Sequence, residues 1–130
     1  KWVSSILNKE DVFIYGDGET SRDFCYIDNT VQMNLLAAMA DNDKATDQVY
    51  NVAVNDRTSL NQLYQMIEDR LVQRTTGLEK KEPIYRDFRA GDVRHSLADI
   101  SKAKRLLGYH PKYMIPKGMD ESIDWYINNL

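Results

Sequence analysis

The sequence predicts a mixed α/β domain, and three observations support this fold class. Short apolar segments that alternate like strands are interspersed with longer segments whose apolar residues recur at helical spacing. The order of these segments is irregular and contains no clean run of β-α-β units. The length of 130 residues and the 42% of hydrophobic residues fit one folded domain, residues 1–130.

The first third of the chain is predicted to contain the end of a helix, two strands and a second helix. The helix end lies at Lys1–Asn8 and the first strand at Val12–Tyr15. The turn GDGETS leads to a second strand at Asp23–Ile27. The second helix is capped by Asp28 or Asn29 and carries four apolar residues on one face: Val31, Leu35, Leu36 and Met39.

The middle of the chain predicts a strand, a helix and an extended segment. Gln48–Val54, QVYNVAV, alternates well enough for a strand. Thr58 is the expected N-cap of a helix whose apolar face holds Leu60, Leu63, Tyr64, Ile67 and Leu71. Pro83–Phe88 is expected to be extended, because proline fixes its own φ and restricts its neighbour.

Two helices are predicted at the carboxyl end. Asp99 is the expected cap of a short helix that Gly108 ends. Pro116 suits the first turn of a last helix, because its missing N–H has no partner there in any case.

Composition excludes some functions. The 17 basic and 20 acidic residues leave a net charge of −3, which argues against a general nucleic-acid or membrane-surface role. Cys25 is the one cysteine and favours a reducing, cytoplasmic setting; on a strand it would be a buried structural thiol. His95, His110 and Cys25 are too few for a structural zinc site.

Arg22 and Arg89 are the candidate ligand-binding residues, because both lie at expected strand ends. A guanidinium offers a planar fork that matches phosphate oxygens. The alternative is local pairing, of Arg22 with Asp23 or Asp17 and of Arg89 with Asp87 or Asp92.

Phe13 and Tyr15 share one face of the strand that leads into the first turn. They could form a wall for a flat base, or they could pack in the core. The turn itself, GDGETSRDF, permits a phosphate loop, a plain hairpin, or a turn that places Arg22.

Two segments together resemble a known family. FIYGDGETSRDFCYIDNTVQMNLLA and YRDFRAGDVRHSLADISKAKRLLGYHPKY resemble two signatures of extended short-chain dehydrogenase/reductases that act on nucleotide sugars. YNVAVNDRTSLNQL and the spacing between the segments also resemble that family. The closest resemblance is to UDP-N-acetylhexosamine 4-epimerases of O-antigen and Vi-type polysaccharide synthesis. The resemblance implies that this chain is the carboxy-terminal part of a longer enzyme, without its Rossmann half.

The resemblance also implies residue roles. Phe13 and Tyr15 match positions beside uracil, and Arg22 and Arg89 match the diphosphate arginines. Asp92 matches the carboxylate that accepts from the ribose hydroxyls, and Trp2 is a further nucleotide contact. Ser96 matches the position that discriminates among sugars, where a serine leaves room for a 2-acetamido group.

For the whole enzyme, the resemblance implies NAD, a UDP-N-acetylhexosamine substrate and a homodimer. It places the NAD loop and the Tyr-x-x-x-Lys pair before Lys1, so it assigns no catalytic residue here, and the isolated chain is expected to be inactive. Two alternatives stay open. One is the substrate part of another nucleotide-sugar dehydratase, decarboxylase or reductase, and the other is a freestanding binding module without a catalytic role.

Overall fold

The computed structural model describes all 130 residues and has the predicted mixed α/β fold. Helix α1 (Trp2–Leu7) leads to strand β1 (Phe13–Tyr15), as predicted. Strand β4 (Ile84–Arg86) lies parallel to β1, so the extended segment expected there is confirmed. Strands β2 (Ser21–Arg22) and β3 (Thr58–Ser59) form a second, antiparallel pair.

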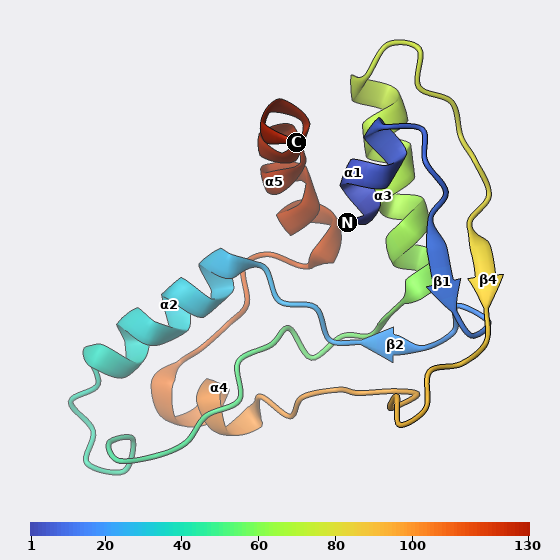
Figure 1. Ribbon diagram of the computed structural model, residues 1–130. Helices are drawn as coiled ribbons and strands as arrows, with labels where there is room; N and C mark the ends of the chain where they lie inside the picture. Colours follow the sequence, from blue (N-terminus) through green and yellow to red (C-terminus); the bar gives the residue numbers. More distant parts are fainter.

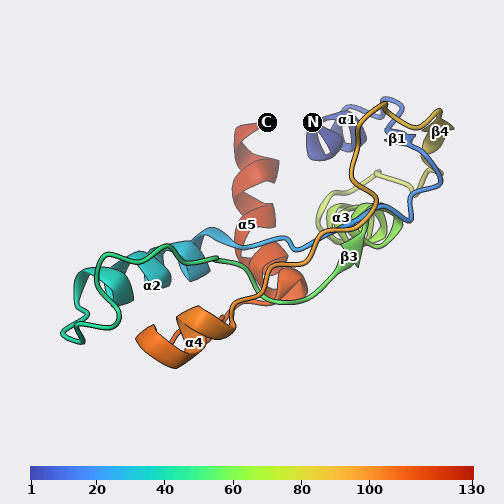
Figure 2. The ribbon, with the colours of Figure 1, turned by 90° about the horizontal axis from the view of Figure 1, so that it is seen from below.

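The helices form two groups (Figure 1). Helix α3 (Leu60–Arg74) packs against α1 and against α5 (Ile115–Asn129), while α2 (Ile27–Ala38) and α4 (Ser101–Leu107) extend to the other side. The view turned by 90° shows the same separation (Figure 2). None of the helices combines the length and the hydrophobicity that a membrane span requires.

Each group of helices has its own apolar cluster. The first cluster joins α1, β1, α3 and α5, and its buried members are Ile6, Val12, Ile14, Tyr64, Ile67, Leu71, Leu78 and Ile123. The second joins α2, α4 and the segments between them through Met33, Ala45, Ala53, Ile100, Ala103, Leu107 and Tyr109. The first cluster therefore supports β1, whose buried Ile14 faces it while Phe13 and Tyr15 face the other way.

The predicted strand at Asp23–Ile27 is wrong, since β2 ends at Arg22 and α2 begins at Ile27. The Asp23 carboxylate explains the difference. It accepts backbone N–H groups from Val54 and Asn55, both at 3.0 Å, so the chain is held here by a side chain instead of a ladder. Cys25 is accordingly not on a strand, and it is half-buried rather than buried.

The predicted cap of α2 is also wrong, because Tyr26 is the N-cap and makes no side-chain cap bond. Asn29 is fully buried, and it bonds the backbone of Lys112 and Tyr113 at 2.7–3.1 Å. The amide thus ties α2 to the segment before α5.

Gln48–Val54 is not a strand. The segment runs in the second cluster with Ala53 buried, but Val49 is 86% exposed and no neighbouring strand pairs with it. A strand needs a partner for its backbone groups, and this chain provides none there.

The remaining helix signals hold with small shifts. Ser59, not Thr58, caps α3 in a reciprocal capping box with Gln62. Asp99 accepts the N–H of Ser101 at 2.8 Å, although Ile100 is the formal N-cap of α4. Gly108 ends α4 in the left-handed conformation at φ 65°, as predicted. Pro116 lies in the first turn of α5, also as predicted.

Candidate functional site

The site begins with the pairing of β1 and β4. Tyr15 lies beside Arg86 in the parallel register, so side chains of Phe13, Tyr15 and Arg86 emerge on one face. Hydrogen bonds of 2.8 Å at both ends hold the pair, from Ile84 N–H to the Val12 carbonyl and from Gly16 N–H to the Arg86 carbonyl.

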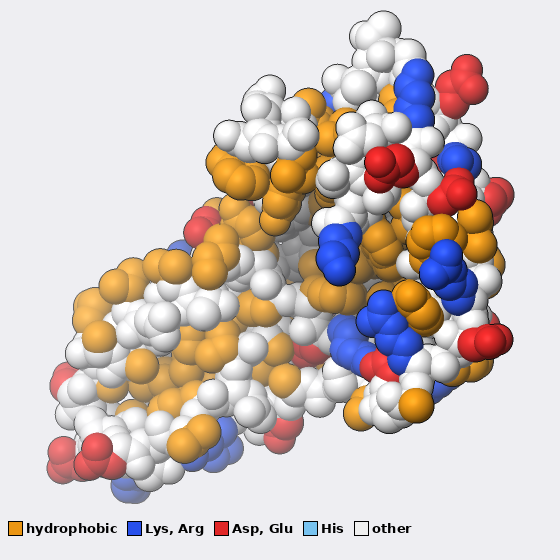
Figure 3. Space-filling model, viewed as in Figure 1, with side chains coloured by type: hydrophobic (Ala, Val, Ile, Leu, Met, Phe, Trp, Pro, Cys, Tyr) orange, Lys and Arg blue, Asp and Glu red, His pale blue; other side chains and the backbone are white.

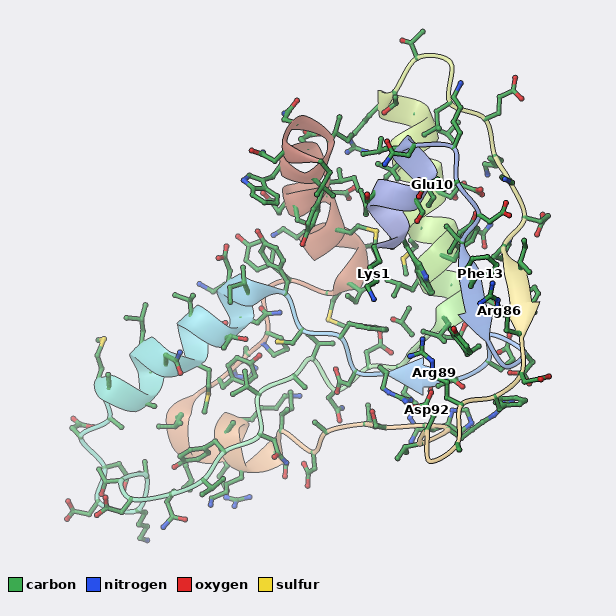
Figure 4. The ribbon with its side chains drawn as sticks, in the orientation of Figure 1. Lys1, Glu10, Phe13, Arg86, Arg89 and Asp92 are labelled. Atoms are coloured by element: carbon green, nitrogen blue, oxygen red, sulfur yellow. The ribbon has the colours of Figure 1, made fainter.

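Two guanidinium groups cover the two aromatic rings of β1. Arg86 Cζ lies 3.5 Å from the centroid of the Phe13 ring, and Arg89 Cζ lies 3.8 Å from that of Tyr15. Hydrogen bonding to Arg89, and then to Arg86, lowers the pKa of Tyr15. The rings are therefore neither bare nor packed in the core, since each presents its face to an arginine. Figure 4 labels Phe13 and Arg86, which lie together on β1 and β4.

Arg22 is held from several directions at the end of β2. Its Nη1 donates to the Ser21 carbonyl at 2.9 Å, and its Nη2 donates to Asp92 Oδ1 at 2.5 Å. A bond of 3.2 Å from Asp92 N–H to the Arg89 carbonyl closes the RAGD turn, which brings Asp92 beside Arg22. Arg22 thus pairs with an acid 70 positions away and not with its neighbour Asp23 or with Asp17.

Arg89 makes no ion pair, and its guanidinium contacts the Tyr15 side chain instead of a carboxylate. The predicted alternative, in which Asp87 or Asp92 neutralises it, is therefore wrong. In Figure 3, basic side chains gather on this face over β1 and β2. The net charge of −3 thus coexists with a local basic surface.

A cavity of about 260 Å³ brings most of the predicted site together. It is lined by Trp2, Phe13, Tyr15, Thr20, Arg22, Leu60, Arg89 and Asp92. Five of the six predicted substrate-binding residues are in this set, and the sixth, Ser96, is not. A larger cavity of about 430 Å³, beside Lys80 and Lys81, contains no arginine and only three apolar residues. The chemistry that suits a nucleotide lies in the smaller one.

Ser96 is exposed, but its backbone is fixed relative to Arg22. Its N–H donates to the Ser21 carbonyl at 3.2 Å, and Ser21 also bridges to His95. The Ser21 hydroxyl lies 2.9 Å from His95 Nδ1. Strand β2 therefore carries Arg22 and positions the segment that holds Ser96.

The GDGETS segment is a turn that is filled by protein. Gly16 and Gly18 have φ values of 85° and 76°, and a Cβ on Gly18 would lie 1.8 Å from Asn61 Oδ1. Asp17 pairs with Arg94 at 2.6 Å, which lowers the pKa of Asp17, and Glu19 accepts from Asn61 at 2.7 Å. Side chains occupy the space beside both glycines, which argues against a phosphate loop, and the turn leads into β2, which carries Arg22.

Three site residues were missed by sequence reasoning: Arg86, Thr20 and Leu60. Thr20 and Leu60 line the cavity because the Leu60 N–H donates to the Thr20 carbonyl at 3.0 Å, which joins the turn to α3. Arg86 could be placed beside Tyr15 only once β4 was known to pair with β1 in parallel. The available signal was that Arg86 stands two positions after Ile84 in the predicted extended segment, which puts both side chains on one face.

The chain contains one Tyr-x-x-x-Lys spacing, from Tyr113 to Lys117, although the sequence analysis assigns no catalytic residue to this chain. Tyr113 precedes α5, and the centroid of its ring lies 5.1 Å from that of the Tyr26 ring. Lys117 Nζ lies 4.4 Å from the centroid of the Tyr113 ring. Neither residue lines the arginine cavity. The spacing therefore does not place a catalytic pair at this site.

Comparisons with known proteins agree with the geometry. A family model described as GDP-mannose 4,6 dehydratase matches residues 1–122. The solved UDP-N-acetylglucosamine 4-epimerase of Methanobrevibacter ruminantium, in complex with UDP-N-acetylmuramic acid, is 35% identical with a TM-score of 0.83, over 100% of this chain and 39% of that one. The solved protein MoeE5, in complex with UDP-glucuronic acid and NAD, is 29% identical with a TM-score of 0.84, over 99% and 40%.

Among curated relatives, the UDP-glucuronate 4-epimerase of Thermodesulfobacterium geofontis is 30% identical over 100% of this chain and 38% of its own length. The chain spans about two fifths of the length of the curated relatives it matches. With a family model matched over residues 1–122 and the paired signatures brought together in one cavity, the chain belongs to the extended short-chain dehydrogenase/reductase family of nucleotide-sugar epimerases and dehydratases.

Proposed function

We propose that this chain is the carboxy-terminal, substrate-binding part of an NAD-dependent UDP-N-acetylglucosamine/UDP-N-acetylgalactosamine 4-epimerase. The observation that carries the proposal is the cavity in which two aromatic residues of β1 meet two arginines and a carboxylate. Such a cavity suits a ligand with a flat base at one end and a diphosphate next to it.

Arg22 and Arg89 grip the diphosphate in this proposal, and Asp92 accepts from the ribose hydroxyls. Arg89 is available because no carboxylate neutralises it, and Arg22 is oriented by carbonyl groups of Ser21 and Arg94. Each charge-assisted contact contributes about 1.5–3 kcal/mol. Two such contacts would anchor the nucleotide while the sugar rotates and presents first one face and then the other, as epimerisation requires. The contacts act alike on substrate and product.

Ser96 is proposed to face the sugar, where its small side chain leaves room for a 2-acetamido group. The support is its fixed position on the segment bonded to Ser21, next to Arg22 in β2. The solved relative named as a UDP-N-acetylglucosamine 4-epimerase is in keeping with an acetamido sugar.

NAD is proposed to bind outside this chain. The double-glycine turn does not fit it, because side chains of Phe88 and Asn61 fill the space that a Cβ would take at Gly16 and Gly18. No residue here is assigned as the catalytic base, so the chain alone should not turn over substrate. A cytoplasmic homodimer acting in polysaccharide synthesis completes the proposal for the whole enzyme.

Calorimetric titration of this chain with UDP tests the proposal. Arg89→Ala should weaken binding by about 10–100-fold, which is the loss of one charge-assisted contact. Arg105→Ala is the matched control, since Arg105 is exposed on α4 away from the cavity. Equal affinity of the Arg89→Ala variant and the unaltered chain would contradict the proposal.

A second candidate keeps the site and changes the chemistry to dehydration, decarboxylation or reduction of another nucleotide sugar. The description of the matching family model, a dehydratase, favours it. Turnover of UDP-N-acetylglucosamine by the longer enzyme separates the two, because an epimerase returns an isomer of the same mass and a dehydratase releases water. Lack of any longer reading frame would instead favour a freestanding binding module.

A further inference from the structure

Arg86 is a second arginine without an acidic partner on the site face. It makes no ion pair, and its hydrogen bonding is to the Tyr15 hydroxyl, so most of its five N–H donors have no partner. Its guanidinium lies flat on Phe13 at 3.5 Å, and Phe13 in turn lines the cavity. The group therefore lies one side chain away from the cavity, beside Phe13, which Figure 4 labels with it.

The position of Arg86 differs from that of the two anchoring arginines. Arg22 and Arg89 line the cavity together with Asp92, whereas Arg86 does not line it. Arg86 is associated with Phe13, and Arg89 with Tyr15, so the two free guanidinium groups are arranged along β1. A nucleotide whose diphosphate lies at Arg22 and Arg89 extends its base toward Phe13 and thus toward Arg86.

Strand β4 holds Arg86 in place before any ligand arrives. Its backbone is bonded to Val12 and Gly16 of the neighbouring segment at 2.8 Å. The loop before β4 is tied to α3, because Glu68 accepts the Lys81 N–H at 2.7 Å and Tyr64 donates to the Lys81 carbonyl at 2.5 Å. A donor group fixed in this way loses little entropy when it binds.

We propose that Arg86 reads the base of the nucleotide and selects bases that present carbonyl oxygens toward it. This inference rests on the proposed function, since it requires a nucleotide in the cavity. A guanidinium has five donors and no acceptor, so its free edge bonds the 4-keto oxygen of uracil but not the 4-amino group of cytosine. Stacking on Phe13 fixes the plane of the guanidinium and therefore the direction of its N–H donors. The ammonium of a lysine is not planar and would not be oriented in this way.

The experiment compares three ligands on four forms of this chain. Binding of UDP, CDP and inorganic pyrophosphate is measured by calorimetry for the unaltered chain, Arg86→Ala, Arg86→Lys and the control Arg105→Ala. The unaltered chain should prefer UDP to CDP by about tenfold, as expected for a directional base contact. Arg86→Ala and Arg86→Lys should both reduce that preference to about twofold or less, and pyrophosphate binding should stay unchanged in Arg86→Lys.

Each contrary result has its own meaning. Equal weakening of UDP, CDP and pyrophosphate by Arg86→Ala, with full rescue by Arg86→Lys, would make Arg86 a phosphate contact and overturn the base-reading role. An undiminished preference for UDP in Arg86→Ala would overturn it as well. Failure of the unaltered chain to bind UDP would contradict the proposed function itself. Because Arg86 is exposed, both variants should melt within a few degrees of the unaltered chain, which confirms that they fold.

Discussion

Arg22 and Asp92 form an ion pair with 2.5 Å between Nη2 and Oδ1, across 70 positions of sequence. The pair joins the end of β2 to the turn after β4. Both partners are partly exposed, at 29% and 40% of their side-chain area, so the pair is accessible to a ligand. Without a ligand, the Asp92 carboxylate occupies the donor edge that the proposed diphosphate would use.

Asp92→Asn should therefore raise the affinity for pyrophosphate and lower the preference for UDP over pyrophosphate. Pyrophosphate should bind about two- to fivefold more tightly, because an exposed ion pair that competes for Arg22 is worth less than about 1 kcal/mol. The preference for UDP over pyrophosphate should fall, because the ribose loses a charged acceptor. Calorimetry with both ligands measures the effect, and Asp87→Asn, an exposed acid without an ion pair, is the control. Weaker binding of pyrophosphate by Asp92→Asn would count against this competition.

Ser96→Tyr should exclude N-acetylated sugars in the longer enzyme and spare unacetylated ones. Overfilling a shaped pocket costs about 1–3 kcal/mol, which corresponds to a 5–150-fold loss of kcat/KM for UDP-N-acetylglucosamine relative to UDP-glucose. Ser101→Tyr, at an exposed position of α4, controls for the added bulk. Equal turnover of the two sugars by the Ser96→Tyr variant would remove the gatekeeper role.

Sequence patterns predicted the elements that are determined by residues close together in the sequence. The apolar spacing of α3, the left-handed Gly108 and the proline at the start of α5 were sufficient, and all three are confirmed. Gln48–Val54 failed because alternation alone does not supply a neighbouring strand. Asn29 failed as a cap because its amide bonds a backbone segment more than 80 positions away.

The candidate site shows the same division. Arg22 and Arg89 could be singled out from the two signatures, but Arg86 depended on the parallel pairing of β1 and β4, which no local pattern specifies.

The outer face of α2 should cause self-association of the isolated chain. Ile27, Val31, Leu35 and Met39 recur every four residues and are 47–78% exposed, and Figure 3 shows apolar side chains along this helix. Leu35→Glu should shift the chain toward monomer in analytical ultracentrifugation, because it places a charge in the middle of the face. Asn34→Glu adds the same charge at the adjacent exposed position and should have little effect. A monomeric unaltered chain at high concentration would refute the prediction.

Gly18→Ala should destabilise the chain more than Gly77→Ala does. Both glycines have φ 76°, so both substitutions carry the backbone strain of about 1–2 kcal/mol. Only at Gly18 does the new Cβ also meet a side chain, Asn61, whereas it meets nothing within 4 Å at Gly77. Displacing Asn61 breaks its bonds to the Asp17 carbonyl and to Glu19 and loosens the turn before Arg22. Equal free energies of unfolding in urea would show that Asn61 moves aside freely.

Asp120 should make stability depend on pH in the acidic range. Hydrogen bonding from Arg70, at 2.6 Å, lowers the pKa of Asp120 in the folded chain, and the contact joins α3 to α5. Because the folded pKa lies below the unfolded value of about 3.9, the contribution is complete above about pH 5 and is lost as the pH falls through the folded pKa.

Asp120→Asn should therefore lower the melting temperature by about 1–3 °C at pH 7, the size expected for an exposed pair in a chain of this length. The difference from the unaltered chain should shrink as the pH falls from about 4 through the folded pKa of Asp120, because the protonated Asp120 is neutral like the asparagine. Glu121→Gln removes an adjacent acid without an ion pair and should show no such pH-dependent difference. A deficit in Asp120→Asn that stays constant down to pH 3 would mean that the side chain stabilises the α3–α5 contact by packing and not by its charge.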